Sequence, residues 1–292
     1  MNTSLDQVIK KIDKLPELFH VAVKVSRMLE DPEVNAQALA NTISLDQALT
    51  TQILKLCNSA HYGFSKNITS IHDAIVKMGF KTLKSLVFMA VSHGSLSQEV
   101  KGYGLEKGDL WRNSISCAVY AQKLAVITKY KDPELAFTAG LLRDIGKLMI
   151  HEYVGTGYND IVNVVNSQNI SFSEAETKIL GFNHSEIGST MAQKWNFPEV
   201  LVDVIKYHHI PESAMELGCK DIKLVSIIHV ADSISMMLGS GIGSDGMMYN
   251  FSLKSLENIN IKKDSLNIEE ILAEMVELSP EIESMLGSLN GK

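Results

Sequence analysis

The protein has 292 residues, of which 45% are hydrophobic and 21% are charged, and its formal net charge is -7. A negatively charged chain has no basic surface field to displace counterions from a nucleic-acid backbone, so DNA and RNA are not expected partners. No apolar run approaches the ~20 residues of a membrane-spanning helix, and the N-terminus lacks the layout of a signal peptide. A cytoplasmic protein that does not enter a membrane is therefore expected.

Apolar residues recur at helical spacing in nearly every part of the chain. The clearest runs are Leu18, Ala22, Val25 and Leu29, then Leu49, Ile53 and Leu56, and later Leu224, Ile227, Ile228, Ala231 and Ile234. Alternating strand patterns are nearly absent, and turn signals divide the chain into roughly a dozen helices of ordinary length. The sequence therefore predicts an all-α fold, a multi-helical bundle of two subdomains.

Two helix starts in the second half of the chain carry capping signals. Ser171 is followed three residues later by Glu174, and Asn183 by Glu186. In such a pair each side chain accepts a hydrogen bond from the backbone N–H of the other residue, which satisfies two donors at the helix start. We expect helices to begin directly after Ser171 and Asn183.

Domain boundaries are predicted where the chain is poor in large apolar residues. The polar, glycine-containing stretch QEVKGYGLEKGD at residues 98–109 separates an N-terminal helical subdomain, residues 1–100, from a second helical subdomain, residues 101–240. A second weak stretch at residues 239–250 precedes an acidic tail, residues 241–292, which is predicted to be partly helical. The chain is therefore expected to contain two helical subdomains and a tail.

The three cysteines indicate neither a disulfide framework nor a zinc site. Cys57, Cys117 and Cys219 are odd in number, far apart in the sequence and free of CxxC spacing. Such a pattern is typical of buried thiols.

Two groups of sequence blocks point to a function. The first group is LDQALTTQILKLCNSAHYGF at residues 45–64 and SIHDAIVKMGF at residues 70–80. The second group is LWRNSI at residues 110–115, GLLRDIGKL at 140–148, HSEIG at 184–188, QKWNFP at 193–198, KYHH at 206–209 and HVADS at 229–233. In order and spacing these blocks closely resemble the HDOD family, the bacterial HD-related output domain, over about residues 15–238.

The resemblance implies that the second subdomain is a degenerate HD phosphohydrolase domain. Catalytic HD relatives supply a first His, an adjacent His-Asp pair and a last Asp to one or two divalent ions. The corresponding positions here are Asn113, Arg143-Asp144 and Asp232. Asparagine is a poor ligand for a transition metal, and arginine has no lone pair to donate. At an effective dielectric near 20, a guanidinium ~5 Å from a divalent ion would be repelled by roughly 6 to 7 kcal/mol.

We therefore expect no enzymatic activity, and we expect Arg143 to pair with Asp144 or Asp232 where a metal ion would otherwise lie. The candidate ligand-binding or relict HD site comprises Asn113, Arg143, Asp144, His184, His208, His209 and Asp232. No cofactor is expected.

Three histidines in this site leave an alternative open. Catalytic relatives of the HD-GYP type use histidines at places comparable to His184, His208 and His209 for further metal ions. Together with Asp144 and Asp232, these histidines would offer nitrogen and oxygen ligands suited to iron, manganese, nickel or zinc. The other interpretation is that they form hydrogen bonds within the helix packing.

The resemblance implies a non-catalytic signal-transduction or regulatory protein of bacteria. It would act by binding a signalling protein, with a nucleotide as a further candidate ligand. The alternative is a metal-dependent phosphohydrolase or phosphodiesterase that uses a rearranged ligand set on a nucleotide or cyclic dinucleotide.

Overall fold

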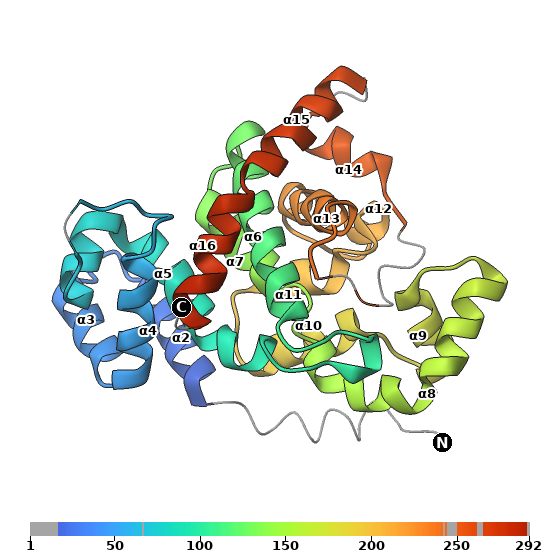
Figure 1. The fold of residues 1–292 in the computed structure, drawn as a ribbon, viewed down its shortest axis with the longest axis horizontal. Coiled ribbons are helices and arrows are strands. Elements are labelled where there is room, and N and C mark those ends of the chain that lie inside the picture. Colours follow the sequence, from blue (N-terminus) through green and yellow to red (C-terminus); the bar gives the residue numbers. More distant parts are fainter. Residues whose placement is uncertain (1–16, 66, 242, 244–249, 262–264, 291–292) are drawn as a thin grey trace. The chain divides into compact units, whose positions relative to one another are not determined.

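The computed structural model describes residues 17–65, 67–241, 243, 250–261 and 265–290. Helices form nearly all of the regular structure in these residues, and the β structure described there is one isolated bridge between Val100 and Leu105. The all-α fold predicted from the sequence is confirmed (Figure 1). None of the helices in the described part of the chain has the length and apolar character needed to cross a membrane.

The chain divides into two compact units. The larger unit contains the described residues of 96–276, and the smaller unit contains those of 15–95 and 277–292. Apart from residues at the two boundaries, the described helices of the smaller unit are α2 (Glu17–Met28), α3 (Ala36–Ser44), α4 (Gln47–Cys57), α5 (Ile71–Leu96) and α16 (Ser279–Asn290). Those of the larger unit are η1 (Lys101–Tyr103), α6 (Asp109–Ile127), α7 (Pro133–Leu142), α8 (Lys147–Gln168), α9 (Phe172–Leu180), α10 (His184–Lys194), α11 (Glu199–Tyr207), α12 (Pro211–Ala214), α13 (Ile222–Met237), α14 (Leu253–Asn258) and α15 (Ser265–Glu277).

In the smaller unit, the side chain of Asn58 ties the end of α4 to the segment that leads into α5. Its amide nitrogen donates to the carbonyl groups of Leu54 and Ile68, at 2.8 Å each. Its amide oxygen accepts a hydrogen bond from the Ile68 N–H at 2.7 Å. Within α5, Gly79 has φ 81° and ψ 170°, a conformation that only glycine adopts readily, so α5 consists of two helical stretches joined by a kink.

The last helix of the chain belongs to the smaller unit. Helix α16 packs against α4, and Glu281 Oε1 lies 2.8 Å from His61 Nδ1. Ile282, Met285 and Leu286, at helical spacing, are buried. Residues 241–292, which the sequence analysis places in one tail, are therefore divided: α14 and α15 belong to the larger unit and α16 to the smaller, because the apolar face of α16 is covered there.

Helix α6 lies at the core of the larger unit. It packs against α7 and α13, and thirteen of its nineteen residues are buried. Helix α13 is apolar around most of its circumference, as expected for a helix enclosed by other helices. Helices α9 and α10 begin directly after Ser171 and Asn183, and both capping boxes predicted from the sequence are present. These five helices, with α8 and α11, carry or adjoin the residues of the polar cluster described next.

Candidate functional site

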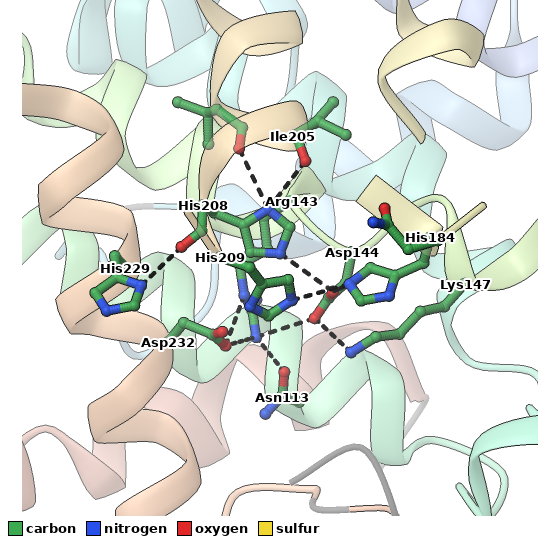
Figure 2. Close-up of polar contacts among 12 residues, drawn as sticks. Asn113, Arg143, Asp144, Lys147, His184, Ile205, His208, His209, His229 and Asp232 are labelled. Carbon is green, nitrogen blue, oxygen red and sulfur yellow. Dashed lines mark hydrogen bonds and ion pairs between the residues drawn. The ribbon is translucent and has the colours of Figure 1, made fainter. Parts of the chain in front are cut away.

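Arg143 lies at the centre of a buried ion cluster (Figure 2). It follows the last residue of α7, and its side chain is 0% exposed. Nε donates a hydrogen bond to Asp232 Oδ1 at 2.8 Å, and Nη1 donates to the Gly140 carbonyl at 3.0 Å. Nη2 lies 3.3 Å from Asp144 Oδ2, and it also contacts Asp232 Oδ1 and donates to Asn113 Oδ1. The guanidinium therefore pairs with both carboxylates, whereas the sequence predicts a pair with one or the other.

The charges of this cluster are stabilised mutually. Burial lowers the pKa of Arg143, but the neighbouring acidic groups, Asp232 first among them, together outweigh burial and raise it, so the guanidinium stays charged. Burial raises the pKa of Asp144, but Lys147, whose Nζ is 2.9 Å from Asp144 Oδ2, and then Arg143 outweigh that effect. The pKa of Asp144 is held well below its usual range, and its carboxyl group is ionised at neutral pH.

His184, the first residue of α10, is held by a buried carboxylate on α9. Its Nδ1 lies 2.7 Å from Glu176 Oε2, and its backbone N–H donates to the same oxygen at 3.0 Å. The Tyr103 hydroxyl donates to Glu176 Oε1. On the other side of the ring, His184 Nε2 lies 2.9 Å from His209 Nε2 and 3.5 Å from Asp144 Oδ1. Burial lowers the pKa of His184, but Glu176 outweighs it and raises the pKa above its ordinary value.

His208 and His209 directly follow α11, and their rings also lie near the Asp144 carboxylate. His208 Nδ1 lies 2.9 Å from the Ile205 carbonyl, and its Nε2 lies 3.7 Å from Asp144 Oδ1. Burial, followed by the neighbouring His208 and His184 rings, holds the pKa of His209 well below its usual value. The three imidazoles and one carboxylate therefore converge on one point (Figure 2).

Two glycines allow the helices of this site to approach each other. A Cβ atom at Gly146 would lie 1.9 Å from the carbonyl oxygen of His184, and one at Gly188 would lie 2.8 Å from Cγ2 of Ile205. The first contact is far below van der Waals separation, so a side chain does not fit at residue 146 unless the backbone moves. The turn before α8 and the start of α10 thus lie backbone to backbone, which brings Asp144 beside His184.

The HD fold is associated with divalent ions, and the two halves of this cluster fit an ion differently. Around Asn113 and Asp232, the guanidinium of Arg143 makes the contacts that an ion would make, and a cation without lone pairs excludes a metal ligand sphere. In the other half, ligand atoms of Asp144, His184, His208 and His209 all lie within 4.8 Å of one another and form a group that could hold a metal ion. Nitrogen and carboxylate donors in this ratio suit borderline divalent transition metals.

A small pocket lies beside the histidines and wholly within the larger unit. Its volume is about 150 Å³, and its lining includes His184, His209, Lys147, Phe172 and Met236. The pocket gives small molecules access to one side of the cluster.

All seven residues predicted for the site lie in this one cluster, namely Asn113, Arg143, Asp144, His184, His208, His209 and Asp232. Three further members were not predicted: Lys147, Glu176 and Tyr103. Glu176 had a detectable signal, because it falls at helical spacing on the same face as the apolar Phe172, where a solvated carboxylate is not expected. Tyr103 lies 73 positions from Glu176, so nothing local in the sequence joins them.

Comparisons with known proteins find a solved structure of the same fold and relatives in sequence. A solved HDOD domain protein of unknown function from Geobacter sulfurreducens is 26% identical, with a TM-score of 0.74 over 94% of this chain and 92% of that one. An uncharacterised protein of Treponema pallidum is 29% identical over 69% of this chain and 39% of its own length. The Vibrio cholerae protein named cyclic di-GMP phosphodiesterase CdgJ is 28% identical over 50% of this chain and 32% of its own length.

The chain thus spans about a third to two fifths of the length of these two curated relatives. The HDOD domain family matches residues 15–211, which include the smaller unit's first helices and most of the buried cluster. This protein belongs to the HDOD domain family.

Proposed function

We propose that this protein is a signal-transduction or regulatory protein that acts by binding and does not catalyse phosphate-ester hydrolysis. The observation that carries the proposal is the buried guanidinium of Arg143 between Asp144 and Asp232. Hydrolysis at an HD site requires electron-pair donors around its ions, and an arginine supplies a fixed positive charge with none.

The size of the pocket supports recognition of a protein rather than deep burial of a nucleotide. Ligand sites that enclose most of a small molecule usually have volumes of roughly 300 to 1,000 Å³. The pocket beside His184 has a volume of about 150 Å³, which suits a single side chain or one ring of a ligand. A signalling protein is therefore the proposed partner, and a nucleotide would be held only in part.

A metal-dependent phosphohydrolase is the second candidate, and the group formed by Asp144, His184, His208 and His209 favours it. The name of the Vibrio cholerae relative, a cyclic di-GMP phosphodiesterase, points in the same direction. A divalent ion held by these residues would supply Lewis acidity toward a phosphoryl oxygen. However, the neighbouring cations Arg143 and Lys147 already neutralise much of the negative charge that would hold a second divalent ion beside the first.

Turnover measurements separate the two candidates. Purified protein would be incubated with bis(p-nitrophenyl) phosphate and with a cyclic dinucleotide, in the presence of manganese, iron or nickel. We expect no hydrolysis above the metal-only blank. Turnover that a chelator abolishes, and that Asp144→Ala and Asp232→Ala both lose, would overturn the non-catalytic proposal. Affinity capture from the native cell, with a stoichiometric partner as the expected result, tests the binding role directly.

A further inference from the structure

The hydrogen-bond partners of two buried histidines determine which ring nitrogen carries the hydrogen in the neutral form. The Nδ1 atoms of His184 and His208 face acceptors only, a Glu176 carboxylate oxygen at 2.7 Å and the Ile205 carbonyl at 2.9 Å. Each Nδ1 must therefore carry a hydrogen, and in the neutral rings each Nε2 presents a lone pair. In this way outer carboxylate and carbonyl partners set the tautomer and orientation of metal-binding histidines.

The lone pair of His208 is directed at another acceptor. His208 Nε2 lies 3.7 Å from Asp144 Oδ1, too far for a hydrogen bond, and the described residues give this 0% exposed nitrogen no hydrogen-bond partner. Two buried acceptors that face each other repel unless a cation lies between them. Asp144 Oδ2 is engaged by Lys147 and Arg143, so Oδ1 is the oxygen that remains for that cation.

From this geometry we propose that the protein binds one divalent transition-metal ion through Asp144 Oδ1 and the imidazoles of His184, His208 and His209. Tetrahedral ligands at metal–nitrogen distances of 2.0 to 2.1 Å lie about 3.4 Å from one another. Three of the separations here are 2.9, 3.5 and 3.7 Å, and all the ligand atoms lie within 4.8 Å of one another, so the more distant pairs must come closer together when an ion binds. The stoichiometry is one ion, because Arg143 fills the half of the cluster that contains Asn113 and Asp232.

Glu176 and Tyr103 act as positioning residues for this site. Glu176 fixes the ring of His184, and the Tyr103 hydroxyl holds the other carboxylate oxygen. The site stands independently of the proposed absence of catalysis, since an ion can be bound without turnover of a phosphate ester. Access for the ion is through the pocket that His184 and His209 line.

Cobalt titration of the full chain, stripped with chelator beforehand, tests the site. We expect one Co²⁺ per chain by elemental analysis. We also expect the intense visible absorption that is typical of Co²⁺ with four ligands in tetrahedral geometry. His209→Asn, at the edge of the cluster, should weaken binding at least tenfold, and Glu176→Gln should weaken it roughly 10- to 100-fold while it shifts the spectrum. His72→Asn, an exposed histidine in the smaller unit, is the matched control and should bind like the wild type.

Circular dichroism of each variant establishes that it is folded before its binding is interpreted. Absence of Co²⁺ binding at millimolar concentration, binding of two ions, or binding that His209→Asn leaves unchanged would each refute the proposed site. None of these results depends on hydrolysis, so the proposed function and the metal site can fail separately.

Discussion

Arg143 and Asp232 are 89 positions apart in sequence, and the Arg143 Nε donates to Asp232 Oδ1 at 2.8 Å in a fully buried ion pair. Their neighbour Asp144 also depends on this guanidinium for its charge balance. Replacing Arg143 with Met should therefore leave the buried carboxylate of Asp232 without its cation and that of Asp144 with Lys147 alone. We expect the free energy of unfolding to fall by about 3 to 5 kcal/mol, measured by urea denaturation.

The control for this substitution is Lys220→Ala, which removes a cation from an exposed pair with Glu199 and should change stability little. The double variant Arg143→Met/Asp232→Leu should recover part of the loss, because it removes the uncompensated charge with its partner. If Arg143→Met were as stable as the wild type, the ion cluster would not be buried as described.

A side chain at residue 146 should disrupt the site without removing any functional group. In Gly146→Ala, the new Cβ would lie 1.9 Å from the His184 carbonyl oxygen, so α8 and α10 must separate. We expect a loss of at least 1 to 3 kcal/mol in the free energy of unfolding. Gly94→Ala is the matched control, since its Cβ meets nothing within 4 Å and the change should be neutral or stabilising by up to about 1 kcal/mol.

The thiols should be inert in the folded protein. Burial raises the pKa of Cys57 to about 12 and also raises the pKa values of Cys117 and Cys219. Because the thiolate is the reactive form, a raised pKa keeps all three thiols neutral at pH 8. We expect no reaction with a disulfide reagent such as DTNB until urea unfolds the chain, after which three thiols react. Rapid reaction of a native thiol would contradict the burial of that residue.

Removal of the Asn58 side chain should destabilise the smaller unit selectively. Asn58→Ala loses three hydrogen bonds to Leu54 and Ile68 and leaves backbone groups of Ile68 without these partners. We expect a loss of about 2 kcal/mol, seen as a lower midpoint in thermal unfolding. Asn41→Ala, which removes an exposed hydrogen bond to Gln37, should have no comparable effect.

Much of the fold and about two thirds of the buried cluster were predictable from the sequence. Periodicity predicted the helices, and the capping boxes at Ser171 and Asn183 predicted two helix starts to the residue, because both signals are local. Arg143 and its pairing followed from the resemblance and from the chemistry of a guanidinium. The sequence does not decide which of the two carboxylates Arg143 contacts, and in the structure it contacts both.

The remaining features depend on residues distant in sequence. Tyr103 joins Glu176 only after η1 packs against α8 and α9, and no spacing rule connects them. Likewise the close approach of Gly146 to His184 depends on how two helices cross. Sequence patterns predict which face of a helix is buried. They do not predict which other helix packs against that face, and these contacts depend on that packing.

Since α16 completes the hydrophobic core formed with α4, the smaller unit is built from segments nearly two hundred residues apart. During synthesis on the ribosome, α2 to α5 emerge long before α16. The apolar surface that α16 covers therefore stays exposed until α16 has been synthesised. The larger unit has all of its described helices earlier and can fold first. A released chain that ends before residue 279 should therefore be protease-resistant in the larger unit and cleaved readily in α2 to α5.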